Sequence, residues 1–381
     1  QRLAEPARIN NQIHLNIIFG NTVKKIAILG TVGIPASYGG FETLAQNLVN
    51  YAAEESLDVD ITVYCSGILE GSPKNFNGAS LQYINLDANG VSSIFYDILS
   101  LIKATRAGYD LILLLGISGA IFLPFVRLFS NVRIVTNVDG VEWRRDKWGP
   151  FASLFLRISE WSAVKYSHDV ICDNRGIADH VLIAYEKESH VIAYGGDHAV
   201  LGLGAACNND TVHLPENYCL ALCRIEPENN IKLILDAFSE TPDQCLVFIG
   251  NWDKSGFGRF MRVTYSNFPN IWLLDPIYDL GVLMTIRSGC ALYVHGHSAG
   301  GTNPSLVEMM HFGKPILAYD CIYNRATTQD QAIFFESANA LVKLLELDVE
   351  TLSVSGDLMV GIARKKYVWS EIGGQYFKLL M

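Results

Sequence analysis

The chain has 381 residues, of which 50% are hydrophobic and 18% are charged. At about 150 residues per domain, this length predicts two to three domains, and the composition excludes fibrous and low-complexity proteins. Lys and Arg number 29 against 39 Asp and Glu, giving a formal net charge of −10. This balance argues against a protein that binds nucleic acid over its whole surface, although a local basic patch is compatible with it.

Three features bear on the cellular compartment. Residues 1–23 fit neither a signal peptide nor a clear helix, and we interpret them as an N-terminal extension. The 8 cysteines lie mostly in apolar, strand-like stretches without metal-ligand spacing, which favours reduced structural thiols in the cytoplasm. Residues 111–129 approach membrane-spanning length, but Gly116, Pro124 and Arg127 interrupt them, so we predict a buried strand followed by a short helix.

From residue 24 onward, short β-rich runs alternate with helix-length amphipathic runs. The first series of predicted strands lies at residues 24–30, 61–67, 80–86, 109–116, 132–138, 169–173 and 190–196. Several are continuously apolar, as parallel strands covered on both faces are. Residues 41–55 carry apolar side chains at helical spacing. The pattern predicts an α/β, doubly wound domain over residues 24–200.

A second alternating series follows a change in composition. Residues 201–217 are small and polar, as in a linker. The predicted strands beyond them lie at residues 218–225, 245–251, 271–277, 291–296, 315–320 and 332–335. Two Rossmann-like domains joined by a linker form a deep cleft, which the carboxyl ends of both sets of strands face.

The first predicted strand ends in GTVGIPASYGGFET, a Gly-rich turn that enters a helix. Backbone N–H groups at such a turn can approach a phosphate or a sugar. The spacing differs from G-x-G-x-x-G, so a nicotinamide fingerprint is not supported. Gly39 and Gly40 are therefore binding candidates, with a simple tight turn as the alternative.

Arg224 ends the strand YCLALCRI, where a planar, permanently charged side chain can pair with a diphosphate. The alternative is a salt bridge to Glu226 or Glu228. The following Asn229 and Asn230 are more typical of helix caps than of ligand contacts.

The most informative stretch is residues 293–320, YVHGHSAGGTNPSLVEMMHFGKPILAYD. An apolar strand enters a loop rich in His and Gly, then Pro304 opens a helix, and the amides at its start favour an anion. Glu308 lies about one turn inside that helix and can reach ribose hydroxyls. Because His295 and His297 are two apart on a strand end, they should point to opposite faces, and no metal site is predicted.

Residues 137–167 combine a cleft carboxylate with a basic, aromatic segment. Asp139 closes a strand and can accept a hydrogen bond from a hydroxyl. Basic and aromatic residues then alternate ahead of an amphipathic helix, which suits a membrane surface or a lipid-linked pyrophosphate. A helix packed on the domain core with a solvated start is an equal alternative. The candidate acceptor or membrane residues are Glu142, Arg144, Arg145, Lys147 and Trp148.

Taken together, these stretches resemble the family 4 glycosyltransferases of the GT-B fold, in particular a bacterial rhamnosyltransferase-like branch. The resemblance spans residues 24–381 and rests on GTVGIPASYGGFET, DGVEWRRDKWG, CRIEPENN, GNWDKSGFG, LLDPIYD and HGHSAGGTNPSLVEMMHFGKPILA. It implies a nucleotide-sugar-binding domain over residues 218–365. It also implies that residues 366–381 form a helix that crosses back to the N-terminal, acceptor-binding domain.

The resemblance further implies sugar transfer from a nucleotide diphosphate to an acceptor alcohol, with retention and without an obligatory metal or cofactor. Asp139 and His297 are the catalytic candidates. The donor would be held at the base, the ribose, the diphosphate and the transferred sugar. The implied donor residues are Gly39, Gly40, Arg224, Asn229, Ile277, Ser298, Gly300, Gly301, Thr302, Asn303 and Glu308.

Three positions depart from the family pattern. Asn229 stands where a Lys is common, Gly300 where a Glu is common, and Val32 where this branch suggests Arg. The leading hypothesis is a cytoplasmic, peripherally membrane-bound rhamnosyltransferase of surface-polysaccharide assembly, using dTDP- or UDP-sugar and a lipid-linked or glycan acceptor. The departures motivate an alternative, a catalytically weak binding subunit. A nucleotide-sugar epimerase is a third hypothesis.

Overall fold

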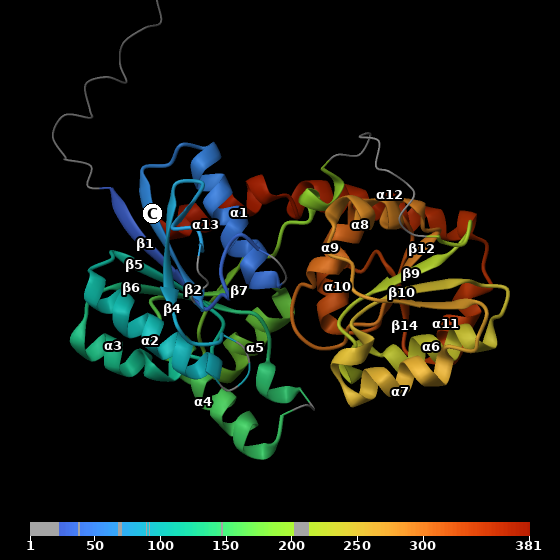
Figure 1. The fold of residues 1–381 in the computed structure, drawn as a ribbon, viewed down its shortest axis with the longest axis horizontal. Helices are drawn as coiled ribbons and strands as arrows, with labels where there is room; N and C mark the ends of the chain where they lie inside the picture. Colours follow the sequence, from blue (N-terminus) through green and yellow to red (C-terminus); the bar gives the residue numbers. More distant parts are fainter. Residues whose placement is uncertain are drawn as a thin grey trace, which may run out of the picture.

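A computed structural model describes residues 23–36, 39–67, 71–88, 90, 92–145, 148–201 and 213–381. Two α/β domains lie side by side, each a sheet with helices on both faces (Figure 1). This architecture confirms the predicted fold class. The seven described cysteines are free thiols, as expected, while Cys207 lies outside the described residues.

The sheet of the N-terminal domain has the order β3-β4-β2-β1-β5-β6-β7-β8 among the described residues. Its pairs are parallel apart from β3 with β4. The strands are β1 (Lys24–Leu29), β2 (Val59–Ser66), β3 (Asn75–Phe76), β4 (Ala79–Ile84), β5 (Leu111–Leu115), β6 (Arg133–Val138), β7 (Asp169–Cys172) and β8 (His190–Val191). Each predicted strand overlaps one of these, and the two-residue β3 was not predicted.

Helices cover both faces of this sheet because its strands are apolar on both sides. They are α1 (Gly40–Glu54), α2 (Ser92–Ala107), α3 (Leu123–Phe129), α4 (Pro150–Tyr166) and α5 (Arg175–Tyr185), with short 3-10 turns η1 (Ala120–Phe122), η2 (Glu142–Arg144) and η3 (Asp197–Val200). The helix predicted at residues 41–55 is α1, whose buried stripe includes Leu44, Leu48 and Val49.

The long apolar stretch at residues 111–129 forms β5, η1 and α3, as predicted. Every residue of β5 is buried in the middle of the sheet, and Pro124 lies in the first turn of α3. In the part of the chain that the structure describes, no helix is both long and apolar enough to cross a bilayer.

The C-terminal domain has a parallel sheet of order β11-β10-β9-β12-β13-β14 in its described residues. The strands are β9 (Cys219–Leu222), β10 (Leu246–Ile249), β11 (Ile271–Leu274), β12 (Leu292–His295), β13 (Ile316–Tyr319) and β14 (Ile333–Phe335). The helices are α6 (Ile231–Glu240), α7 (Gly256–Tyr265), α8 (Leu280–Gly289), α9 (Pro304–Met310), α10 (Ile322–Thr328) and α11 (Ala338–Leu345), with turns η5 (Pro227–Asn229) and η6 (Trp252–Lys254). Each predicted strand of the second series overlaps one of these strands.

The last two helices join the domains. Helix α12 (Val349–Lys366) packs on α9, and α13 (Trp369–Leu380) returns to pack on α1 (Figure 1). There the ring of Phe377 stacks on Tyr51 with centroids 5.7 Å apart, and Asn137 Nδ2 donates to the Tyr376 hydroxyl at 2.7 Å.

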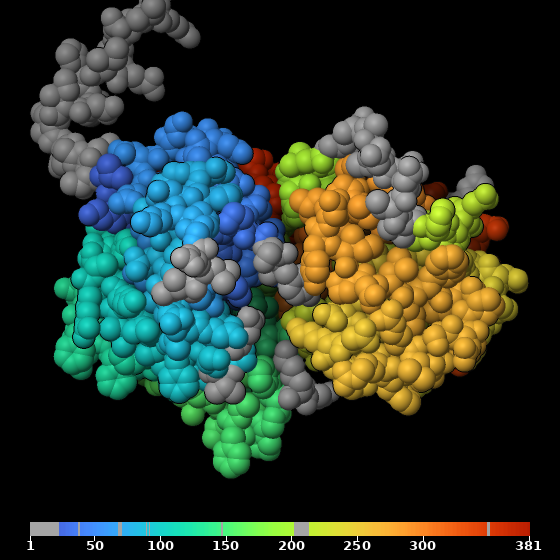
Figure 2. All heavy atoms as spheres, in the orientation of Figure 1, coloured from blue at the N-terminus to red at the C-terminus, as the bar shows by residue number. Residues whose placement is uncertain are grey.

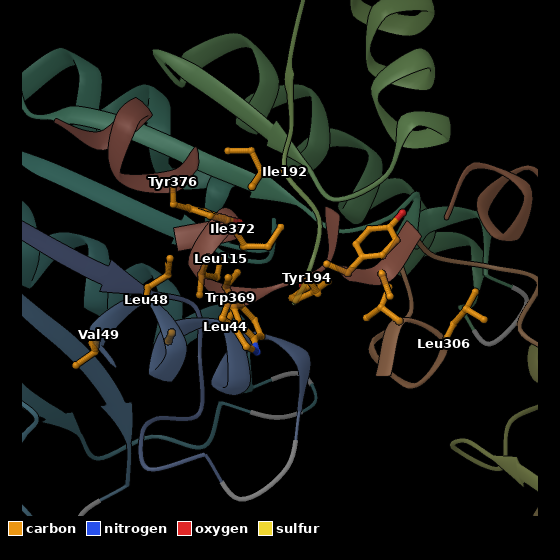
Figure 3. Close-up of a cluster of buried hydrophobic side chains, with 14 of the residues drawn as sticks. Leu44, Leu48, Val49, Leu115, Ile192, Tyr194, Leu306, Trp369, Ile372 and Tyr376 are labelled. Carbon is orange, nitrogen blue, oxygen red and sulfur yellow. The ribbon is translucent and has the colours of Figure 1, made fainter. Parts of the chain in front are cut away.

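One hydrophobic cluster therefore runs through both domains (Figure 3). Its labelled side chains come from α1, β5, the segment after β8, α9 and α13. They are Leu44, Leu48, Val49, Leu115, Ile192, Tyr194, Leu306, Trp369, Ile372 and Tyr376. This shared core fixes the two sets of strand ends against each other across the cleft.

Candidate functional site

The loops that follow the strands of the two domains touch at the cleft. A Cβ atom on Gly140, after β6, would lie 3.2 Å from the Gly300 Cα, and one on Gly301 would lie 1.8 Å from Asp173 Oδ1. Gly40 is also close to the second domain, because its Cβ would lie 3.7 Å from Pro304. The glycines here let the backbones of the two domains meet without intervening side chains.

His297 is held in one orientation at this contact. Its Nδ1 lies 2.5 Å from Asn229 Oδ1, and Asn229 Nδ2 donates to the Arg224 carbonyl at 2.6 Å. The amide oxygen of Asn229 therefore accepts the proton of Nδ1, which leaves Nε2 as an unprotonated acceptor. A Cβ on Gly300 would lie 3.0 Å from that Nε2. Nε2 thus points at the interdomain contact.

The imidazole of His297 is neutral. Burial, together with the charges of Arg145 and Arg224, holds its pKa well below the usual range. Burial also lowers the pKa of the adjacent His295 to about 3. The rings of His295 and His297 lie 5.9 Å apart, so the expectation that they point to opposite faces is wrong, because residues two apart on a strand share a face. In the described residues, no group of His, Cys, Asp or Glu is arranged to hold a metal ion. A neutral imidazole in this position can accept a hydrogen bond from a sugar hydroxyl.

The polar side chains of the loop after His297 form hydrogen bonds with backbone groups of the protein, and these bonds fix the shape of the loop. Ser298 N and Oγ both donate to the Glu228 carbonyl, at 3.1 and 2.7 Å. Thr302 Oγ1 donates to the Asp173 carbonyl at 2.5 Å, and Asn303 Oδ1 accepts from Ser305 N at 2.9 Å, which caps α9. The loop shape therefore depends on these side chains.

Asp139 follows β6 directly and lies beside the same contact. Burial and the charge of Glu142 raise its pKa to about 6, although Arg145 and Arg224 oppose the rise. A carboxylate that titrates near neutral pH can accept a hydrogen bond or a proton from a substrate hydroxyl. Burial and the charge of Asp139 also raise the pKa of Asp173 well above its usual range.

Arg145 forms an ion pair that joins the domains. Its guanidinium lies 2.7 Å from Glu142 Oε1 and 3.2 Å from Glu228 Oε1 of the C-terminal domain. The side chain is only 7% exposed, so Arg145 does not contribute to a basic surface. Arg144 is exposed with its guanidinium 5.0 Å from the Trp143 ring centroid, and Trp148 is exposed as well. Lys147 lies outside the described residues.

Arg224 is exposed after β9, and its charge lowers the pKa of both Asp139 and His297, which places it at the same cleft. Ile277 is partly buried beyond β11, against the shared core.

Glu308 lies within α9 and is ionised. Burial opposes its ionisation, but Arg287 and His198 hold its pKa below the usual value. Arg287 contacts Glu308 Oε2 directly, while His198 Nε2 lies 3.3 Å from Oε1. Trp369 Nε1 in turn donates to His198 Nδ1 at 3.0 Å, which links this carboxylate to the crossover helix.

The turn after β1 is braced by Glu42. Its Oε1 accepts from Thr31 Oγ1 at 3.1 Å and from Val32 N at 2.7 Å. Gly39 has φ +129°, and a Cβ there would lie 1.9 Å from Glu42 Oε2, so this position requires glycine. Gly40 begins α1 next to it.

Sequence reasoning did not find four of the residues that shape this site, which are Glu42, Asp173, His198 and Arg287. It considered Glu228 only as a partner of Arg224, and the structure pairs Glu228 with Arg145. Asp173 had a usable signal, because it ends the apolar run DVICD as Asp139 ends its own strand. His198 and Arg287 had none, since their partners are distant in sequence.

Comparisons with known proteins bear on the fold of the chain. A family model described as "Domain of unknown function (DUF1972)" matches residues 23–197. No curated protein matches the chain. Sucrose-phosphate synthase of Thermosynechococcus elongatus is similar over 94% of this chain and 98% of its own, with a TM-score of 0.74 and 16% identity. The chain has the GT-B fold.

Two further GT-B structures support that assignment. The trehalose 6-phosphate synthase of Burkholderia multivorans covers 94% of this chain and 96% of its own length, with a TM-score of 0.70 and 11% identity. HepE of Anabaena, solved in complex with UDP-glucose, covers 93% and 99% with a TM-score of 0.66 and 13% identity. The similarity thus extends over both domains.

Proposed function

We propose that the protein is a glycosyltransferase that moves a sugar from a nucleotide diphosphate to an acceptor alcohol in the cleft between its domains. The observation that carries this proposal is the neutral His297 in the cleft. Its unprotonated Nε2 points at the contact between Gly300 and the N-terminal domain. HepE of Anabaena, which has a similar fold, was solved in complex with UDP and in complex with UDP-glucose.

Each cleft residue has a role in this proposal. Arg224 pairs with the diphosphate, since a guanidinium is charged at every physiological pH. His297 Nε2 accepts from a hydroxyl of the transferred sugar and orients it. Before transfer, Asp139 accepts a hydrogen bond from the acceptor hydroxyl and orients it. The donor is a substrate, and no metal or further cofactor takes part.

Transfer proceeds with retention in this proposal. The acceptor oxygen forms its bond to the anomeric carbon on the face from which the diphosphate leaves, and the acceptor proton passes to the leaving phosphate oxygen. No protein nucleophile is required. Fixed dipoles of the cleft stabilise the charge that develops on the leaving group.

We further propose a rhamnosyl donor, dTDP-rhamnose, and a lipid-linked acceptor in surface-polysaccharide assembly at the cytoplasmic face of a membrane. This finer assignment is supported by the sequence motifs alone. In this proposal, residues 24–200 bind the acceptor and residues 218–365 bind the donor. Glu308 contacts the ribose of the donor nucleotide, and Ile277 contacts its base.

The test is thermal unfolding with a panel of nucleotide diphosphates and nucleotide sugars. A ligand at about one hundred times its Kd adds roughly 2.7 kcal/mol of stability. We expect a selective shift that disappears in Arg224→Ala and persists in the control Arg262→Ala, whose guanidinium pairs with Asp253 and Asp275 outside the cleft. No shift with any nucleotide would contradict the proposal.

Product analysis then separates the functional classes. With donor and a lipid-linked acceptor, we expect a glycosylated product, and His297→Ala should reduce turnover while leaving the nucleotide-induced shift in place. Nucleotide binding without transfer to any acceptor would favour the binding subunit. Conversion of the donor sugar without acceptor would indicate an epimerase.

A further inference from the structure

Helices α3 and α4 expose large apolar side chains on one side of the N-terminal domain. Both pack their buried residues into the same core layer and against each other, so their exposed sides face outward together. We call this surface the α3–α4 face. Its exposed apolar residues are Phe125, Leu128, Phe129, Phe151, Leu154, Ile158 and Trp161.

The α4 part of the face is a continuous helical stripe. Phe151, Leu154, Ile158 and Trp161 recur every three or four residues, and Phe151 is 91% exposed. Residues around 150, coloured green, project from the lower side of the domain (Figures 1 and 2). An exposed apolar stripe on an amphipathic helix suits the boundary between lipid headgroups and acyl chains.

The exposed charged side chains of α3 and α4 are all cationic. The exposed charged residues of α3 and α4 are Arg127, Arg157 and Lys165. The one acid of these two helices, Glu160, is fully buried, where it accepts from Tyr185 at 2.6 Å and from Trp143 at 3.2 Å. This local positive charge contrasts with the net charge of −10 of the chain.

Cation–aromatic pairs lie at the edge of the face. Lys165 Nζ lies 5.0 Å from the Trp161 ring centroid, and Arg157 lies 5.4 Å from that of Trp143. Lys and Arg on apolar stems, next to Trp, suit the boundary between lipid headgroups and acyl chains.

We infer that the α3–α4 face binds an anionic lipid bilayer, with the stripe of α4 in the headgroup and acyl boundary and its cations against lipid phosphates. A second copy of the chain is a poorer occupant, because two-fold docking of this face would bring like charges together. Membrane binding by this face is inferred from its own side chains. Only its link to a lipid-linked acceptor rests on the proposed function.

The α3–α4 face lies near the cleft in which the proposed lipid-linked acceptor would bind. Helix α4 begins six residues after the end of η2, and the residue that follows η2, Arg145, reaches across the cleft to Glu228. A bilayer bound at α4 would therefore lie beside the cleft, and a lipid-linked sugar could enter without leaving the membrane.

The experiment is flotation of the full chain with vesicles of phosphatidylcholine, with and without about 30% phosphatidylglycerol, in the absence of nucleotide. We expect binding to the anionic vesicles that falls about ten-fold in Phe151→Ser/Leu154→Ser and about ten-fold in Arg157→Glu/Lys165→Glu. Because no nucleotide is present, failure here is distinguishable from failure of the proposed transfer.

The matched control is Phe260→Ser/Val263→Ser on α7. This helix also exposes two large apolar residues, but its Arg262 is paired with Asp253 and Asp275. We expect the control to bind like the unaltered chain. Absence of vesicle binding, or equal loss in the control, would overturn the inference. So would a solution dimer that Phe151→Ser/Leu154→Ser converts to monomer.

Discussion

Asp139→Asn should stabilise the protein in a pH-dependent way. Burial and Glu142 raise the pKa of Asp139 from 3.8 to about 6, so the folded state holds a proton that the unfolded state releases at lower pH. Between these values the folded state binds more protons, and its stability falls as pH rises. At about 1.4 kcal/mol per pH unit, ionised Asp139 costs the folded state about 3 kcal/mol.

The assay is denaturant unfolding of both proteins between about pH 4 and pH 8, reported as the difference in free energy of unfolding. The advantage of Asp139→Asn should be near zero at the acidic end, grow through the window from 3.8 to about 6, and reach about 3 kcal/mol above it. Asp243→Asn, at an exposed turn before β10, is the control and should show no such trend. A difference that does not change with pH would refute the reasoning.

Two further substitutions test the packing of the cleft. Gly301→Ala would place a Cβ 1.8 Å from Asp173 Oδ1, so we expect denaturant unfolding to show a free energy of unfolding lower by about 1–3 kcal/mol. The control Gly361→Ala, which has open space around it in α12, should raise the free energy of unfolding by up to about 1 kcal/mol. Glu308→Gln would leave the buried Arg287 without its charged partner, so the free energy of unfolding should fall by about 3–5 kcal/mol. An unchanged midpoint of denaturant unfolding would contradict a stabilising ion pair.

Much of the fold could be predicted from the sequence, because it depends on local patterns. The continuously apolar runs identified the parallel strands, and the interruptions at Gly116 and Pro124 separated β5 from α3. Asp139 was found because strand ends of parallel sheets meet at one edge. These signals involve residues close together in the chain.

The rest of the site depends on partners that no local pattern reveals. Asn229 looked like a helix cap, but it fixes the ring of His297, which lies 68 residues away. Arg145 looked like part of a basic surface, but its partner Glu228 comes from the other domain and buries it. Charge and spacing alone cannot distinguish an exposed guanidinium from one that is paired across a domain boundary.

The crossover helix has a consequence for biosynthesis. Domains generally fold as units while the chain leaves the ribosome, the N-terminal one first. Here α13 supplies Ile372, Tyr376 and Phe377 to the core that α1 covers, so the first domain lacks part of its interior until residues 369–380 emerge. A fragment ending at residue 197, the limit of the family match, would expose that apolar surface. The natural folding unit of the first domain therefore includes both ends of the described chain.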